Sequence, residues 1–167
     1  MAGRAPRPRR RDRPDRHHDS RVAVVAARFN ERITKRLLSG ALRALSSAGL
    51  PDEAVEVHWV PGSFELPQAA MVLARSGRFA GVVCVGVVIK GGTPHFDYVC
   101  SVAAHGISRV GLDTGVPVTF GVITALTEEQ AWERAGGAVG NRGEEAALAA
   151  LEMAGWLRAR RRGRGKR

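Results

Sequence analysis

Gly81-Val-Val-Cys-Val-Gly-Val-Val-Ile89 is the stretch of sequence that decides the fold, because it holds no charged residue and is dominated by valine. An uninterrupted apolar run of this length is typical of a strand buried on both faces of a parallel sheet. Val22–Ala27 has the same pattern, and Pro117–Ile123 gives a further strand. Val55–Trp59 alternates apolar with polar residues, so we expect it to be a half-exposed strand at a sheet edge.

Segments with helical spacing of apolar residues follow these strands. Thr127-Glu-Glu-Gln130 has the pattern of a capping box and predicts a short helix, which Gly136-Gly137 interrupts. The longer helices are expected over 33–49, 66–77, 97–111 and 143–158. Regular alternation of strands and helices predicts an α/β three-layer sandwich, with a four-stranded parallel sheet and helices on both faces.

The net charge of +10 is concentrated at the two ends of the chain. Residues 1–20 carry a net charge of +4 and residues 158–167 carry +7, whereas residues 21–157 carry −1. We therefore expect one α/β domain over 21–157, a disordered Arg-rich arm over 1–20 and a frayed or disordered basic tail over 158–167. Such arms bind polyanions weakly and in a salt-dependent way. A specific nucleic-acid role is disfavoured, because it usually needs a basic face on the domain itself, interleaved with aromatic residues.

The cysteines and the hydropathy of the sequence indicate in which compartment the protein is expected. Cys84 and Cys100 have neither the spacing of a disulfide framework nor that of a metal site, and no group of metal-ligating residues is recognisable in the sequence. No apolar run approaches the 18 or so residues of a membrane span, and the basic N-terminus lacks a signal-peptide core. The expected location is the cytoplasm.

Chemically unusual residues follow the first three strands. These are Arg28-Phe29-Asn30, Pro61-Gly62-Ser63-Phe64-Glu65, and Lys90 to Asp97. In an open parallel sheet, ligands bind beyond the carboxyl ends of the strands, where the strand order reverses. The sequence therefore predicts a site at this edge of the sheet.

The residue types in these loops suggest anion binding and proton transfer, although each also has a structural interpretation. Gly91-Gly92-Thr93 leads into a helix, so its N–H groups can point at an anion, or the glycines only make a tight turn. His95 is suited to proton transfer, or makes a structural hydrogen bond at the helix start. Phe29 can stack on a planar ring or close the core, and Glu65 can contact a ligand or complement a helix dipole. A Walker lysine and a GxGxxG pattern are absent, which argues against nucleotide binding.

Taken together, five collinear segments closely resemble the lumazine synthase family. They are Ala27–Asn30, Val60–Pro67, Gly86–Val99, Pro117–Gly121 and Asn141–Ala146, and the resemblance covers about residues 21–157. It implies a flavodoxin-like strand order and a transferase of riboflavin biosynthesis. Such enzymes condense 5-amino-6-(D-ribitylamino)uracil with 3,4-dihydroxy-2-butanone 4-phosphate to 6,7-dimethyl-8-ribityllumazine and phosphate, without metal or organic cofactor.

The resemblance also implies residue roles. His95 would be the catalytic proton carrier, and Gly92, Thr93 and Arg134 would bind the phosphate. The pyrimidine and ribityl groups would be held by Phe29, Asn30, Ser63, Phe64, Glu65, Val88, Ile89 and Lys90, with Phe120 and Arg142 supplied by a neighbouring subunit. The family assembles as pentamers, and many members close twelve pentamers into an icosahedral shell of 60 subunits.

Three residues depart from the common family pattern, and two other functions remain open at this point. Gly92 stands where many members carry a larger residue, Lys90 where arginine is common, and Arg142 where lysine is more usual. An archaeal-type riboflavin synthase would share the fold but is not expected to keep the phosphate-binding set. A non-catalytic shell or nucleic-acid scaffold would be expected to lose His95 or Arg134.

Overall fold

A four-stranded parallel sheet forms the centre of the protein. The computed structural model describes residues 21–164, with the side chains of 162–164 left aside, so the predicted arm over 1–20 lies outside the described residues. The strands are β1 (Val22–Ala27), β2 (Val55–Val60), β3 (Gly81–Ile89) and β4 (Val118–Ala125). All pair in parallel in the order β2-β1-β3-β4, so the predicted flavodoxin-like order and the edge position of β2 are confirmed.

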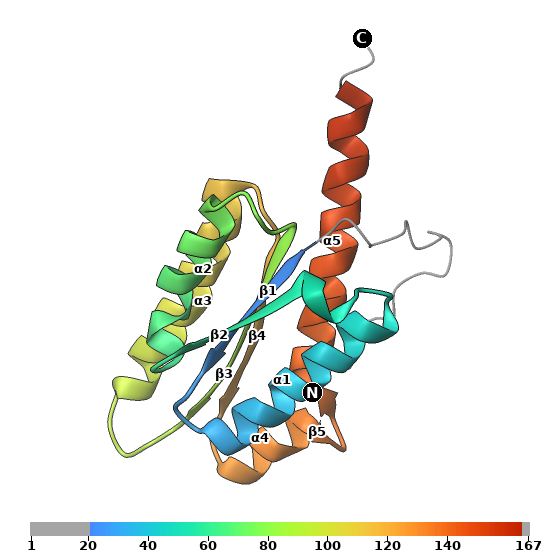
Figure 1. Ribbon diagram of the computed structural model, residues 1–167. Helices are drawn as coiled ribbons and strands as arrows, with labels where there is room; N and C mark the ends of the chain where they lie inside the picture. The colour runs from blue at the N-terminus through green and yellow to red at the C-terminus, as the bar shows by residue number, and fades with distance from the viewer. Residues whose placement is uncertain (1–20, 165–167) are drawn as a thin grey trace.

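Helices cover both faces of this sheet, as predicted (Figure 1). On one face lie α1 (Glu31–Ser47) and α5 (Arg142–Arg164), and on the other α2 (Leu66–Arg75) and α3 (His95–Thr114). Alternate residues of β1 and β3 point into the two resulting clusters; Val83 and Val85 pack with α1 and α5, and Val82 and Cys84 with α2 and α3. A strand that contributes to two cores has no solvated face, which explains the unbroken apolar run of β3.

Short elements complete the chain. The helical turns η2 (Asp52–Ala54) and η3 (Ser63–Glu65) precede and follow β2, and α4 (Glu128–Arg134) follows β4. The predicted cap of α4 is present, since Thr127 Oγ1 accepts from the Gln130 amide at 3.3 Å. The Gln130 side chain accepts from the amide of Leu126 at 3.0 Å rather than from that of Thr127, so the reciprocal bond reaches one residue further back.

Two predicted helices have clearly different bounds in the structure, and the predicted interruption after α4 has a structure of its own. Helix α3 runs over His95–Thr114 rather than 97–111, because Pro94 precedes its first turn and Gly115, in the left-handed conformation, ends it. Helix α5 continues to Arg164, so most of the predicted frayed tail is helical, as the high helix propensity of arginine permits. The Gly136-Gly137 interruption is a two-stranded hairpin of β5 (Ala135–Gly137) and β6 (Gly140–Asn141).

Neither cysteine takes part in a disulfide. Burial raises the pKa of the Cys84 thiol to about 12, so this thiol stays protonated within the core. Within residues 21–164 no helix is long and apolar enough to cross a membrane, and no group of three potential metal ligands is found.

Candidate active site at the carboxyl edge of the sheet

The loops after β1 and β2 are held together at the carboxyl edge of the sheet. The amide of Arg28 donates to the Val60 carbonyl at 2.9 Å, and that of Phe29 donates to the Pro61 carbonyl at 3.0 Å. The parallel pairing of β1 and β2 therefore extends by two bonds beyond the strands. It fixes the backbone of Phe29, while its side chain stays 73% exposed.

Gly62 brings Phe29 and Glu65 to the same place. A Cβ atom built on Gly62 would lie 3.2 Å from a Glu65 carboxylate oxygen and 4.0 Å from Cβ of Phe29. Glu65 is half-buried, and Phe64 beside it is 52% exposed. An aromatic ring and a hydrogen-bond acceptor thus border one small area of the edge.

Ser63 lies beneath this area and over β3. Its side chain is 4% exposed, and its Oγ has no hydrogen-bond partner within the described chain. A Cβ on Gly86 would lie 2.6 Å from that Oγ and 3.2 Å from Cβ of Ala27, so only glycine fits there. The sequence prediction did not include Gly86 among the site residues; an isolated glycine inside the strongest strand pattern was the signal of such a close approach.

Asn30 joins the loop after β1 to β3. It has φ 60° and ψ 40°, and it is the only residue other than glycine with a positive φ among residues 21–164. Asparagine tolerates this conformation better than most residues. Its Nδ2 donates to the Val87 carbonyl at 3.0 Å instead of capping α1, so the side chain bridges two neighbouring strands.

The strand order makes this bridge a switch point. The loop after β1 leads to α1 on one face, and the loop after β3 leads to α3 on the other face. The two connections diverge, which is the condition for a ligand crevice in an open α/β sheet. Val88 and Ile89, both half-buried, end β3 beside this point.

The loop from Lys90 to Pro94 is exposed and ends at the first turn of α3. The Lys90 amide donates to the Ala125 carbonyl at 2.9 Å, and the open space around Gly91 and Gly92 leaves their backbone accessible. His95 is the first residue of this 20-residue helix, and its side chain is exposed. The first N–H groups of an α-helix have no partner inside the helix, so Thr93 and His95 stand where an anion is favoured.

Cys100 lies one turn further along α3 and is not a nucleophile in this setting. Partial burial and the nearby Asp97 carboxylate both raise the pKa of its thiol. Its thiolate is therefore scarce near neutral pH.

Three other predicted site residues, Arg134, Arg142 and Phe120, are not brought to this cluster by any hydrogen bond or ion pair found within residues 21–164. Arg134, at the end of α4, donates from Nη1 to the Gln130 carbonyl at 3.0 Å and is 27% exposed. Arg142 pairs with Glu145 at the start of α5. Phe120 is 41% exposed on edge strand β4, paired with Cys84, about 16 Å before the carboxyl end of that strand.

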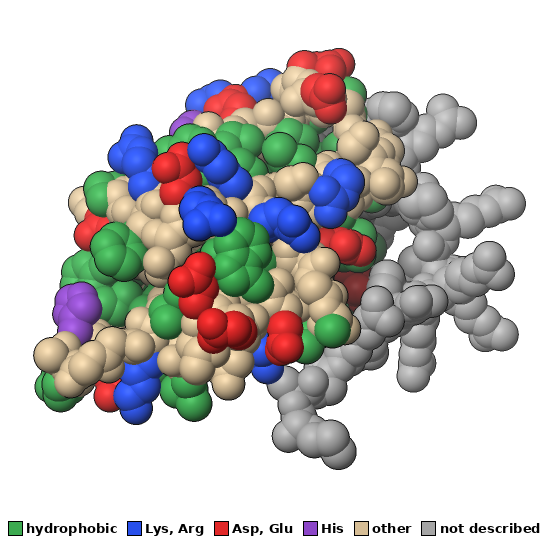
Figure 2. Space-filling view, turned by 90° about the horizontal axis from the view of Figure 1, so that it is seen from below, with side chains coloured by type: hydrophobic (Ala, Val, Ile, Leu, Met, Phe, Trp, Pro, Cys, Tyr) green, Lys and Arg blue, Asp and Glu red, His purple; other side chains and the backbone are tan. Residues whose placement is uncertain are grey.

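The carboxyl edge is an open surface and not an enclosed pocket. Figure 2 shows it from below the view of Figure 1, with apolar side chains lying among basic and acidic ones. The best-defined cavities of the described residues lie elsewhere, one near Phe79 and Arg161 at the amino end of the sheet, and one between α1 and α5. We take the carboxyl edge as the candidate site because the Ser63 hydroxyl without a partner, the exposed phenylalanine rings and the strand switch point all lie there.

The fold is that of the open-sheet α/β class, and the loops after β1, β2 and β3 meet at the carboxyl edge of the sheet. The family model of 6,7-dimethyl-8-ribityllumazine synthase matches residues 19–158, which include every predicted site residue. The chain belongs to this family of transferases, and its function lies in riboflavin biosynthesis. The family implies small-molecule substrates and an oligomeric assembly.

Proposed function

We propose that the protein condenses 5-amino-6-(D-ribitylamino)uracil with 3,4-dihydroxy-2-butanone 4-phosphate to 6,7-dimethyl-8-ribityllumazine, with release of phosphate and water. The observation that carries this proposal is the convergence of Phe29, Asn30, Ser63 and Glu65 at the β1–β3 switch point, next to the helix start that bears His95. A cytoplasmic location remains a prediction from the sequence.

The aminouracil would lie on the loops after β1 and β2. The exposed Phe29 ring offers a stacking surface for the pyrimidine, and Glu65 accepts hydrogen bonds from ribityl hydroxyls. The Ser63 hydroxyl has no hydrogen-bond partner among residues 21–164, so a polar group of the substrate would remove the cost of burying it alone. Phe64, Val88, Ile89 and Lys90 would border the ring.

The butanone phosphate would bind at the start of α3. Backbone N–H groups around Gly92 and Thr93 and the helix dipole favour its negative charge. Arg134 would add two parallel hydrogen bonds to the phosphate, which a planar guanidinium makes well. A change of Arg134 rotamer would be required, since Nη1 now donates to the Gln130 carbonyl.

His95 would move protons between these two groups. The 5-amino group attacks the ketone and water leaves, giving an imine. A proton then leaves the neighbouring hydroxyl-bearing carbon as phosphate departs, and the resulting enol becomes a ketone by moving its proton from oxygen to carbon. The ribitylamino nitrogen attacks this ketone and closes the ring with loss of a second water. Holding the two reactants in contact removes much of the entropic barrier. Proton transfer by an imidazole contributes a further factor of about 10²–10⁴.

The site would be completed by a second subunit in a pentamer, with a 60-subunit shell as the larger form. Support comes from Phe120, which lies about 16 Å before the carboxyl end of β4, and from the open carboxyl edge. Weak polyanion binding by the arms also stays a prediction.

Turnover by single-residue variants tests the proposed reaction. We expect His95→Ala to lower kcat about 10²-fold, with His105→Ala, an exposed histidine of the same helix, as the matched control. Arg134→Ala should raise KM for the butanone phosphate about tenfold, since a charge-assisted hydrogen bond contributes about 1.5–3 kcal/mol; Arg109→Ala serves as its control. Folded wild-type protein that forms no lumazine above the spontaneous rate would exclude the enzyme and favour a non-catalytic scaffold.

Mixed oligomers test the shared site. If Phe120 and His95 act from different subunits, an equal mixture of Phe120→Ala and His95→Ala subunits, refolded together, places both intact residues at about a quarter of the sites. We expect about that fraction of wild-type activity to return. Activity no higher than the mean of the two variants would show that both residues act within one chain or that Phe120 has no role.

A further inference from the structure

Asn141 lies buried where helix α1, the β5–β6 hairpin and the start of α5 meet. Its side chain is 6% exposed, and both ends of its amide are hydrogen-bonded. Nδ2 donates to the Arg36 carbonyl of α1 at 3.0 Å, and Oδ1 accepts from the amides of Gly143 and Glu144 at 2.9 and 3.1 Å. Asparagine is suited to this place because its short side chain offers a donor and an acceptor together. One side chain thus caps α5 and joins it to α1.

The close packing of α1 against this region depends on two glycines. A Cβ atom on Gly40 would lie 2.4 Å from the Asn141 side chain, and one on Gly143 would lie 2.1 Å from the Leu37 carbonyl oxygen. Contacts as short as these would force the backbones apart. The Asn141 amide is therefore held in its place by packing as well as by hydrogen bonds.

The β5–β6 hairpin connects Asn141 to Arg134, the last residue of α4. Asn141 pairs with Ala135, which directly follows Arg134. The Val139 amide, within the hairpin, donates to the Glu133 carbonyl at 3.2 Å. The hairpin thus contacts the residue on either side of Arg134. The hydrogen bond from Asn141 to α1 therefore restrains the end of α4 that bears this arginine.

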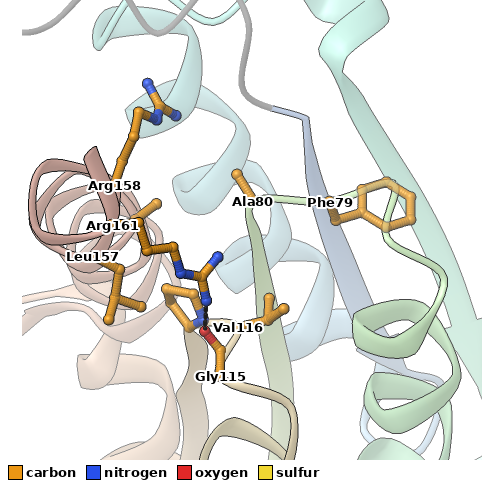
Figure 3. A pocket seen from close by; sticks show the side chains of 9 residues that line it. Phe79, Ala80, Gly115, Val116, Leu157, Arg158 and Arg161 are labelled. Carbon is orange, nitrogen blue, oxygen red and sulfur yellow. Dashed lines mark hydrogen bonds between the residues drawn. The ribbon is translucent and has the colours of Figure 1, made fainter. Parts of the chain in front are cut away.

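Helix α5 is held independently of this hydrogen bond. Ala150 and Leu151 are buried in the core that α5 shares with the sheet and with α1. Near the other end of the helix, Arg161 Nη2 donates to the Gly115 carbonyl, next to the last residue of α3, at 3.0 Å (Figure 3). Loss of the bond from Asn141 to α1 would thus leave α5 in place and affect mainly the hairpin and the end of α4.

We propose that Asn141 is a positioning residue of the enzyme, which sets the place of Arg134 for the substrate phosphate through its hydrogen bond to α1. The inference rests on the proposed function, in which Arg134 binds the butanone phosphate. Arg134 is half-buried, so its reach toward a phosphate depends on where its backbone lies. A guanidinium grips phosphate with two parallel hydrogen bonds of defined geometry. A misplacement of about 1 Å in such a contact can lower the rate about 10²-fold.

Steady-state kinetics of Asn141→Ser test this inference. Serine still caps α5 but is too short to reach the Arg36 carbonyl. We expect KM for the butanone phosphate to rise about fivefold, with KM for the aminouracil and kcat unchanged. Asn141→Asp keeps the oxygen that caps α5 and loses the amide donor, so it should show the same selective change. Thr114→Ala loses one hydroxyl bond at the amino end of the sheet and should keep both KM values, which controls for a loss of stability alone.

Combination with Arg134→Ala shows whether Asn141 acts through Arg134. The double variant should have the same KM for the butanone phosphate as Arg134→Ala alone, whereas independent effects would multiply to about fiftyfold. Circular dichroism would confirm that each variant is folded. Active wild-type protein whose two Asn141 variants keep its KM, or a fully multiplicative double variant, would overturn the inference and leave the proposed reaction intact. Wild-type protein that forms no lumazine would overturn the reaction and this inference together.

Discussion

The two ends of the same parallel sheet are built in opposite ways. At the carboxyl end the chain leaves Phe29 and Phe64 exposed and Ser63 Oγ without a partner, and the loops there rely on glycines. At the amino end charged side chains are paired: Glu56 contacts both Arg21 and Arg78. The exposed phenylalanine rings and the partnerless Ser63 hydroxyl thus contrast with the ion-paired carboxylate of Glu56 at the other end.

This difference suggests that the carboxyl end of the sheet is shaped for function and that the charge pairs at the amino end serve stability. Exposed aromatic rings and an unpartnered buried hydroxyl contribute little to folding, so their presence at one end indicates a surface shaped for a ligand or a second subunit. The paired charges of Glu56, Arg21 and Arg78 at the amino end do not indicate such a surface. Substitution of the exposed side chains at the carboxyl end is therefore expected to change stability little and to lower activity.

The largest expected effect is at Gly86, where the carboxyl end depends on close packing. Gly86→Ala would place a Cβ 2.6 Å from Ser63 Oγ and 3.3 Å from Cδ1 of Leu66, so we expect a loss of about 2–3 kcal/mol in the free energy of unfolding. Gly92→Ala meets no atom within 4 Å and should cost less than about 0.5 kcal/mol. Urea unfolding of both variants measures the contrast, and equal losses would remove the distinction between a packed floor and an open loop.

Phe29→Ala tests whether the exposed ring serves binding and not folding. Since 73% of the side chain is exposed, the unfolding free energy should change by less than about 0.5 kcal/mol. Loss of ring stacking should weaken binding of the aminouracil about tenfold, measured by calorimetry. Val72→Ala, on an exposed position of α2, is the control for both quantities. A Phe29→Ala protein that is destabilised but binds normally would place the ring in the core.

Two threonines, one near each end of the sheet, allow the stability of the two ends to be compared directly. Thr127→Ala removes the acceptor for the Gln130 amide at the start of α4 and should cost about 1 kcal/mol. Thr114→Ala, near the amino end, loses a bond from its hydroxyl to the Val110 carbonyl at 2.7 Å and should cost about 0.5–1 kcal/mol. Thermal unfolding of both variants gives the two values, and a much larger loss at Thr127 would mean that α4 supports more than its own first turn.

The smallest expected effect is an acid dependence confined to the amino end. Desolvation favours protonation of Glu56, but the hydrogen bond from Arg21 and the charges of Arg78, Arg21 and His58 together hold the pKa of its carboxyl below the ordinary 4.5. A lowered folded-state pKa adds stability that is present above the unfolded pKa and is lost as pH falls through the folded pKa. Glu56→Gln should therefore be less stable than wild type at neutral pH, and the difference in urea unfolding should shrink as the pH falls through the folded pKa of Glu56. A difference that persists at acid pH would point to packing.

Most of the fold followed from local patterns in the sequence. The apolar run Val82–Val87 predicts a strand buried on both faces, and in the structure each face contacts a different pair of helices. The alternating pattern of β2 predicts an edge strand, and in the sheet β2 pairs with only one other strand, β1. The end of α3 was misplaced because Gly111 and Gly115 both suit a helix stop, and only the backbone conformation selects Gly115. The small β5–β6 hairpin has too few residues for any periodicity.

The sequence could predict only those parts of the site that directly follow a strand along the chain. Strand ends locate the loops at Phe29, Ser63 and His95, but the contact between Gly86 and Ser63 joins residues of separate strands and loops and has no local pattern. The roles of Phe120 and Arg142 came from the family resemblance alone and stay predictions, because no contact within residues 21–164 brings them to the other site residues.

The direction of α5 has a practical consequence for protein engineering. Ala150 packs at the first residue of β3, Gly81, so the helix end at Arg164 projects about 20 Å beyond the amino ends of the strands. A probe or surface attached to the exposed end of this helix would therefore lie on the side away from the loops after β1, β2 and β3.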